Sequence, residues 1–372
     1  MRPAFSSSRQ AAVFALLLLA LLLAPALAGK RFLPSREQIY SSIWWASGDY
    51  PFFYHQIFQE REPIDILFIG ASHIHTAFGT PYVQEQLIRE LGRPAVARTF
   101  GWGWPGYDNL YFVTRDLLVH RQVRMLVFDD LYSQTDKPHI LAPHMFRFGD
   151  DAASLDGLPW SLKASYYFGA VVGMPHNLMG LVRTNFAPNL HPGKPTHFEI
   201  HDRALNPVTQ LGALTEHLGY APDFLADYYL HPPFVEYTPQ TGAQPSCVCI
   251  YSGDTKTNFA FTGAAIPPLQ LHFVQKFAAL VREHGCQLVL VHIPFYDERR
   301  STVITEPVFW PDVLGTNVTM IGIPPAMLFK GLTDDEIREL YSDPVHLNEN
   351  GQKYFTTLMM PALLKLYESQ NP

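Results

Sequence analysis

The sequence predicts an α/β protein in which a parallel sheet is covered by helices on both faces. Short apolar, β-branched segments alternate with segments of helical spacing, first over residues 64–128 and again from residue 268 onward. Such alternation is typical of parallel sheets, because two parallel strands need a long crossover connection, which is usually a helix. Hydrophobic residues make up 47% of the 372 residues, which excludes a disordered chain.

The first run of alternation contains three predicted strands. The segment at 64–70 is apolar and ends in glycine, as expected of a buried strand. The segment at 81–91 has apolar side chains at helical spacing and stops before Gly92. The expected order is strand, helix, strand, helix and strand, at residues 64–70, 81–91, 95–100, 107–122 and 124–128.

The alternation returns near the C-terminus. The apolar segment at 287–293 predicts a further strand, which Pro294 closes. Residues 333–336 read Thr-Asp-Asp-Glu, a capping box at which a helix should begin. The other expected elements are a helix, a strand and a mostly helical terminal segment, at residues 268–284, 318–323 and 347–367.

Residues 1–28 have the pattern of a targeting segment. Two arginines and no acidic residue precede an apolar run at residues 11–23, and an Ala-x-Ala site ends at Ala28. This is the pattern of a signal peptide, which predicts export to the periplasm or the extracellular space. The alternative is an uncleaved transmembrane anchor in the inner membrane, formed by residues 11–28, which are just long enough to span a bilayer.

The rest of the chain divides into a core in two parts and an intervening segment. Residues 29–132 and 266–372 carry the alternating pattern, so we expect them to form one domain together. Residues 133–265 lack this pattern and are rich in proline, glycine, histidine and aromatic residues, which predicts a large insertion or cap subdomain. A second independent domain is the alternative for this segment.

The charge balance argues against nucleic-acid binding. The net charge is −7, and removal of the leader leaves 25 basic and 34 acidic residues, or −9. Neutralising phosphates requires clustered Lys and Arg, so no nucleic-acid partner is expected. The chain has only three cysteines, which excludes a disulfide framework and leaves open whether Cys247 or Cys249 bridges to Cys286.

Residues suited to catalysis follow the predicted strands, at the edge where open α/β sheets bind their ligands. Ser72 comes directly after the first strand, so its hydroxyl is expected at a strand-to-helix turn. A glycine-rich block, Gly103–Tyr107, follows the second strand. Asp343 lies three residues before His346, a spacing at which a carboxylate can orient an imidazole that activates a serine.

Together these features resemble the SGNH (GDSL-like) hydrolase superfamily. The matching motifs are the strand-Gly-x-Ser start at 70–72, the glycine block at 103–107 and the Asp-x-x-His near the C-terminus. The resemblance covers residues 60–135 and 268–367, and implies a flavodoxin-like three-layer α/β/α sandwich that hydrolyses or transfers ester-linked acyl groups. With its predicted export and large insertion, this chain is similar to the envelope-associated members of the family, some of which acylate or deacylate polysaccharides.

The resemblance assigns a role to each site residue. Ser72 is the expected nucleophile, His346 its general base and Asp343 the acid that orients the imidazole. The backbone N–H groups of Ser72 and Gly106 are the expected donors of the oxyanion hole. The Asn that the family uses as a further donor is absent, and Tyr132 lies nearest to its position, so the Tyr132 hydroxyl is expected to donate instead.

Two departures from the family pattern bear on activity. Ala71 stands where the family has an Asp before the nucleophile. The absent Asn removes one oxyanion donor, and such a loss typically lowers kcat by about 10²–10³-fold. A catalytically degenerate envelope protein that binds glycans is therefore the alternative to an enzyme.

Trp104, Tyr107 and His73 are the candidate substrate-binding residues, because they flank the nucleophile and the glycine block. Ordinary packing is the alternative for the two aromatic residues. His73 and His75 would point about 200° apart on a helix, so they cannot chelate one metal ion from it. No metal and no cofactor are expected, and the expected partner is an acylated small molecule or polysaccharide.

Overall fold

The structure is a computed structural model that describes residues 7–28, 34–42, 50–186, 249–251, 258–314 and 319–370. Its strands are β1 (Ile64–Ala71), β2 (Ala97–Trp102), β3 (Val123–Asp129), β4 (Cys249–Tyr251), β5 (Phe259–Thr262), β6 (Gln287–Val291), β7 (Ile304–Pro307) and β8 (Thr319–Gly322). Its α-helices are α1 (Ser8–Ala28), α2 (Arg36–Ser42), α3 (Tyr50–Tyr54), α4 (Ser72–Ala77), α5 (Thr80–Leu91), α6 (Tyr107–His120), α7 (Ala142–Met145), α8 (Trp160–Phe186), α11 (Pro268–Glu283), α12 (Phe309–Leu314), α13 (Pro325–Leu328), α14 (Asp334–Arg338) and α15 (Glu349–Gln370). Short helical turns of other types are η1 (His55–Gln59), η2 (Phe148–Asp150), η3 (Ala152–Leu155) and η6 (Tyr296–Glu298).

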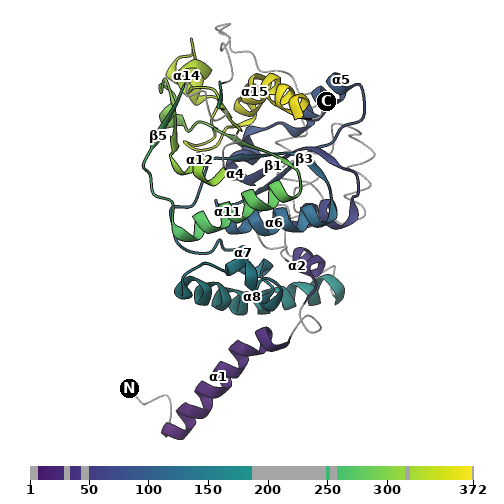
Figure 1. The fold of residues 1–372 in the computed structure, drawn as a ribbon, viewed down its shortest axis with the longest axis vertical. Helices are drawn as coiled ribbons and strands as arrows, with labels where there is room; N and C mark the ends of the chain where they lie inside the picture. The colour runs from purple at the N-terminus through teal and green to yellow at the C-terminus, as the bar shows by residue number, and fades with distance from the viewer. Residues whose placement is uncertain are drawn as a thin grey trace.

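The main sheet has the strand order β2-β1-β3-β6-β8-β4 (Figure 1). The strands from β2 to β8 pair in parallel, and β4 runs antiparallel to β8 at the edge. The parallel part has the order of a flavodoxin-like sheet, in which the first strand lies between the second and the third. The predicted α/β class, a three-layer sandwich with a parallel sheet, is confirmed. Strands β5 and β7 form a separate two-stranded parallel sheet.

Helices cover both faces of the main sheet, because successive side chains of a strand point to opposite sides. In β1, Leu67 and Ile69 pack in the same core as α6 and α11, whereas Ile66 and Phe68 pack in the core that includes α5 and α15. All residues of β1 are buried, as expected of a strand covered on both faces. Figure 1 shows the sheet between α6 and α11 on one side and α15 on the other.

Each strand and helix expected in the two alternating segments is present, with ends that differ by a few residues. The shift is clear in β2, which was expected at 95–100 and runs over Ala97–Trp102. The strand continues because Gly101 pairs with Gly70 of β1. A Cβ at Gly101 would lie 2.4 Å from the ring of His75, so this close approach requires glycine.

The longest described part of the predicted insertion, residues 133–186, packs against the helix layer formed by α6 and α11. Its helices α7 and α8 lie on the side of that layer away from the sheet (Figure 1). Met145, Phe146 and Tyr166 belong to the same hydrophobic core as α6 and α11. This part of the chain therefore extends the core of the sandwich. Two shorter described parts carry β4 of the main sheet and β5 of the small sheet, and residues 187–248 and 252–257 lie outside the described residues.

The predicted leader is helical from Ser8 to Ala28 in α1. Among the residues that the structure describes, no helix combines the length and the apolar character that crossing a bilayer requires. Export by a signal peptide and anchoring by residues 11–28 stay predictions.

Cys286, just before β6, is a free and buried cysteine. Burial raises the pKa of its thiol to about 12, so the thiol stays protonated and unreactive at neutral pH. Cys247 lies outside the described residues.

Asp65 connects the start of β1 to the neighbouring strand and to the terminal helix. Its Oδ2 accepts a hydrogen bond from the backbone N–H of Val96 at 2.8 Å. Its Oδ1 accepts from Arg93 Nη2 at 2.8 Å and from the hydroxyl of Tyr367 in α15. Burial acts to raise the pKa of Asp65, but these donors favour the carboxylate and hold the pKa below its ordinary value.

We expect Asp65→Asn to lower the free energy of unfolding by about 1–3 kcal/mol at neutral pH, because a buried acceptor is lost while the shape is kept. The folded-state pKa of Asp65 lies below the unfolded value of about 3.9. Its contribution is therefore complete above the unfolded pKa and is lost as the pH falls through the folded pKa. Chemical denaturation at neutral and acidic pH measures this, with the exposed Glu90→Gln as control, and a pH-independent loss would contradict it.

Candidate active site

Ser72 lies at the carboxyl end of β1, where the chain turns into a short helix. Ala71 ends the strand in an extended conformation, and Ser72 is the first residue of α4. The first N–H groups of a helix have no acceptor within that helix. The turn therefore presents both the hydroxyl and the backbone N–H of Ser72 at the edge of the sheet.

His346 lies on the loop between α14 and α15, and backbone pairing holds this loop in place. Tyr341 and Leu347, on either side of the loop, form an antiparallel β-bridge. The N–H of Tyr296 donates to the carbonyl of Pro344 at 2.9 Å, which ties the loop to the segment that follows β6. The imidazole of His346 is therefore carried by a braced loop.

The three residues of the predicted triad lie within hydrogen-bonding distance. His346 Nε2 is 2.8 Å from Ser72 Oγ, and His346 Nδ1 is 2.7 Å from Asp343 Oδ2. The other oxygen of Asp343 accepts from the backbone N–H groups of Val345 at 2.8 Å and of His346 at 2.9 Å. The carboxylate is thus held by its own loop and faces the imidazole.

The ionisation of Asp343 determines which nitrogen of His346 carries the proton. Slight burial acts to raise the pKa of Asp343, but hydrogen bonds from the His346 ring and from backbone N–H groups hold it below its ordinary value. A carboxylate only accepts hydrogen bonds, so Nδ1 of His346 carries the proton towards Asp343. Nε2 is then free to accept the proton of Ser72.

An open hollow lies beside the serine. It is lined by Ser72, Gly103, Trp104, Pro105, Leu131, Val345 and His346. Trp104 has a positive φ of 62°, and it is 67% exposed. Such a backbone is rare for a bulky residue and is often found at functional sites. Trp104, one of the predicted substrate-binding residues, thus lies at the hollow.

His139 braces the glycine block that forms one wall of the hollow. Its Nε2 donates to the carbonyl of Gly103 at 2.9 Å, and its backbone N–H donates to Asp108 Oδ2 at 2.8 Å. Gly106 is buried against the same histidine, and a Cβ there would lie 2.7 Å from the Cβ of His139. Gly103 is among the residues that line the hollow and Gly106 is not, and the donors of an oxyanion hole stay a prediction.

Two of the predicted substrate-binding residues are buried, which is a correction. Tyr107 is 3% exposed, and its ring packs edge-on against Trp310 at 5.9 Å between centroids. His73 is fully buried and stacks on Phe295 at 5.0 Å, with its Nδ1 3.4 Å from Asp129 Oδ2. Both side chains point into the core because the first residues of α4 and α6 pack on the sheet.

Tyr132, the predicted substitute for the family's Asn, packs its ring edge-on against Phe309 at 5.5 Å between centroids. It is only partly buried, and it packs against the core on the α11 side. The residue of this segment that lines the hollow is Leu131. The loop after β3 thus brings a leucine side chain to the hollow, and the geometry gives no support for a donor at Tyr132.

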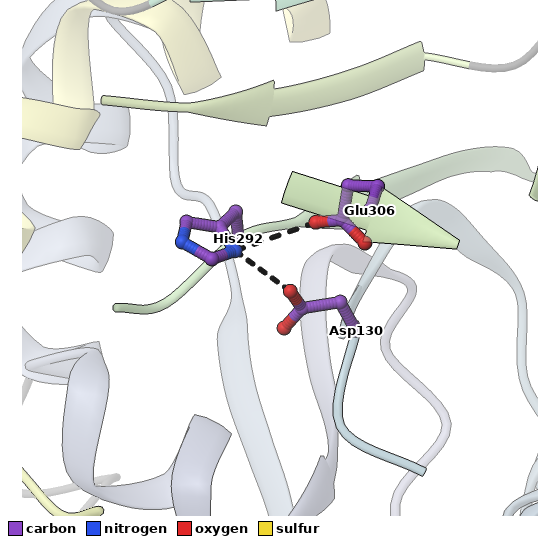
Figure 2. A group of neighbouring side chains, drawn as sticks. All are labelled: Asp130, His292 and Glu306. Carbon is purple, nitrogen blue, oxygen red and sulfur yellow. Dashed lines mark hydrogen bonds and ion pairs between the residues drawn. The ribbon is translucent and has the colours of Figure 1, made fainter. Parts of the chain in front are cut away.

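A second group of ionisable side chains lies at the carboxyl edge of the sheet, and no motif had singled it out (Figure 2). Asp130 follows β3, and His292 follows β6. Asp129 of β3 pairs with Val291 of β6, so the residues after these two strands meet. Glu306 reaches the same place from β7 of the small sheet.

The charges of this second group are strongly coupled. Burial raises the pKa of Glu306, and the nearby Asp130 carboxylate raises it further. Burial acts to lower the pKa of His292, but Asp130 and Glu306 raise it well above its ordinary value. Burial also acts to raise the pKa of Asp130, and the charge of His292 outweighs it and lowers that pKa. These shifts favour the protonated forms of His292 and Glu306 and the ionised form of Asp130.

The first turn of α15 packs against the loop that carries His346, and we expect Gly351→Ala to disrupt it. A Cβ at Gly351 would lie 2.0 Å from the carbonyl oxygen of Leu340 and 2.9 Å from the side chain of Leu347. Because backbone must move, the free energy of unfolding should fall by about 1–3 kcal/mol. Chemical denaturation measures it against Gly149→Ala, where a Cβ meets nothing within 4 Å. Equal stability of the two variants would contradict this packing.

No family model, no curated protein and no solved structure matches this chain. The resemblance to SGNH hydrolases therefore rests on the motifs around Ser72, Gly103 and His346 and on the strand order of the sheet. The arrangement of serine, imidazole and carboxylate beside a hollow has the parts of a nucleophilic acyl-transfer site.

Proposed function

We propose that the protein is a serine esterase or O-acyltransferase of SGNH type that acts on ester-linked acyl groups. The observation that carries this proposal is the pair of hydrogen bonds from Ser72 Oγ to His346 Nε2 at 2.8 Å and from His346 Nδ1 to Asp343 Oδ2 at 2.7 Å. In this order the three groups can activate the serine as a nucleophile. The hollow beside Ser72 leaves room for an acyl carbonyl.

The reaction begins when His346 Nε2 accepts the proton of Ser72 while Oγ forms a bond to the acyl carbonyl carbon. The tetrahedral intermediate then collapses, the bond to the leaving alcohol breaks, and His346 gives its proton to that alcohol. The acyl group remains on Ser72. Water removes it in an esterase and a sugar hydroxyl removes it in a transferase, and in both cases His346 takes the proton of the attacking group and returns it to Ser72.

The negative oxygen of the intermediate needs hydrogen-bond donors aimed at it. We assign this role to the backbone N–H groups of Ser72 and Gly103, because these two residues line the same hollow. The side chain of Asn that the family adds is absent, and Tyr132 packs away from this place against Phe309. With two donors in place of three, we expect kcat to be about 10²–10³-fold lower than with a complete oxyanion hole.

The shape of the site favours a substrate whose bulk stays outside the protein. The hollow is open, and the exposed ring of Trp104 stands at it. An exposed aromatic ring offers a flat apolar surface on which a sugar ring can pack. Because the sequence predicts export, we propose an acylated envelope polysaccharide as the substrate, with small acyl esters as simple substitutes.

A fluorophosphonate probe tests the nucleophile. We expect the wild-type protein to be labelled at Ser72 and to hydrolyse an aryl acetate, and Ser72→Ala to be unlabelled with kcat/KM lower by about 10³-fold or more. Ser369→Ala, which changes an exposed serine of α15, is the matched control. Wild-type protein that is neither labelled nor active on esters would contradict the proposal. Glycan binding without ester turnover, unchanged in Ser72→Ala, would favour the non-catalytic alternative.

Asp343→Asn tests the orienting acid. The backbone N–H groups of Val345 and His346 hold the amide oxygen, so the amide N–H₂ faces Nδ1, donates to it and favours the wrong tautomer of His346. We therefore expect kcat to fall by about 10²–10⁴-fold with little change in KM. Because the pKa of Asp343 is held below its ordinary value, the wild-type carboxylate is charged above about pH 4, so the comparison is made at neutral pH. Steady-state kinetics measure this, with the exposed Asp297→Asn as control, and an unchanged kcat would contradict the role.

A further inference from the structure

Asp130, His292 and Glu306 converge on one point at the carboxyl edge of the sheet (Figure 2). The Nδ1 atom of His292 is 2.7 Å from Asp130 Oδ2 and 3.3 Å from Glu306 Oε1. One nitrogen or oxygen atom of each residue lies within 4.8 Å of the corresponding atoms of the other two. Three side chains from three separate strands thus direct donor atoms at a common space.

The group is enclosed by protein, and its polar atoms are not all satisfied. The side chains of Glu306 and His292 are 1% and 3% exposed, and that of Asp130 is 13% exposed. Neither carboxylate oxygen of Glu306 has a hydrogen bond of normal geometry among the described residues, although Oε1 forms an ion pair with His292 Nδ1 at 3.3 Å. Buried carboxylates are costly unless they are hydrogen-bonded, paired or bound to a metal ion. The carboxylate of Glu306 therefore points to a missing ligand.

The far side of the His292 ring faces another carboxylate. His292 Nε2 is 3.6 Å from Glu298 Oε2. That oxygen of Glu298 also accepts a hydrogen bond from the N–H of Phe295 at 2.8 Å, which holds it in place. Metal-ligating histidines usually direct their second ring nitrogen at a carboxylate or carbonyl that fixes the ring orientation.

We propose that Asp130, His292 and Glu306 bind one divalent transition-metal ion, and that zinc is the best match. One imidazole nitrogen and two carboxylate oxygens are common zinc ligands, and three protein ligands leave a fourth position for water. Two carboxylates also balance the two charges of the ion when His292 is neutral.

The present spacing needs little change to accept the ion. Zinc–ligand distances of about 2.0–2.2 Å place the ligand atoms of a tetrahedral site roughly 3.3 Å apart. The distance from His292 to Glu306 already has this value at 3.3 Å, and the distance from His292 to Asp130 is shorter at 2.7 Å. Asp130 is the most exposed of the three, so it has room to move and gives the ion a route of entry.

The expected role of the ion is structural. Asp130 and His292 follow two central strands of the main sheet, whereas Glu306 belongs to the small sheet formed by β5 and β7. An ion between them would join the two sheets. None of the three residues lines the hollow at Ser72. The inference therefore stands independently of the proposed esterase or acyltransferase activity.

The test uses the full chain, stripped of metal with a chelator and then titrated with Zn²⁺ alone. Elemental analysis after gel filtration gives bound zinc per chain, and thermal unfolding gives the midpoint. We expect wild-type protein to retain one zinc more than Glu306→Gln and to gain about 5–10 °C in midpoint at roughly a hundredfold excess of zinc over its Kd. Glu306→Gln should show no such gain, because its amide keeps the shape of the neutral acid but binds zinc poorly.

Two further variants make the outcome decisive. Asp130→Asn changes the most exposed ligand and should also lose the zinc-dependent gain, even if Glu306→Gln fails to fold. Asp343→Asn, which alters the other carboxylate–imidazole pair, should keep that gain. Wild-type protein that retains no zinc, or the same zinc content and midpoint shift in the wild type and Asp130→Asn, would overturn the proposal. The three side chains would then interact with one another through ion pairs and shared protons, without a metal ion.

Discussion

The parallel pairing of β1, β3 and β6 is the constraint on which the rest of the structure depends. Strands that run in one direction bring the residues after them to one edge, so Ser72, Asp130 and His292 lie along the same side of the sheet. The same pairing buries both faces of each central strand, which requires a layer of helices on each side. The parallel pairing of the strands thus determines both the position of the site and the layered architecture.

Ser72 and His346, the proposed nucleophile and base, are 274 residues apart in the sequence, and α15 helps to bring them together. Thr356 of this helix accepts a hydrogen bond from the N–H of Gly79 at 2.9 Å and donates to the carbonyl of Ala77 at 3.1 Å, at the end of α4. Because α4 begins with Ser72 and the loop before α15 carries His346, this contact fixes one helix against the other. Ser72 and His346 are therefore positioned by packing and hydrogen bonds outside the proposed triad.

Sequence patterns predicted the five parallel strands and the main helices, because apolar runs reflect local physical preferences. The order of the motifs also pointed to Ser72, Asp343 and His346, which the fold brings within hydrogen-bonding distance. Sequence patterns did not predict which glycine lines the hollow, since the left-handed backbone of Trp104 between Gly103 and Gly106 leaves no mark in a glycine-rich block. Tyr107 was misjudged because an aromatic residue near a site and one in the core look alike in sequence. Glu306 could not be placed, because the small sheet that carries it forms through contacts distant in the chain.

The backbone of Trp104 has a consequence for how this surface can change during evolution. A left-handed conformation costs a bulky residue about 1–2 kcal/mol, and glycine alone adopts it freely. Substitution by glycine would therefore relieve strain and remove the aromatic ring in one step. Tryptophan at this position lowers the stability of the fold, and burial does not compensate, because Trp104 is 67% exposed. On stability alone glycine is favoured at this position, so a contact of the ring with a bound molecule would be the compensating gain.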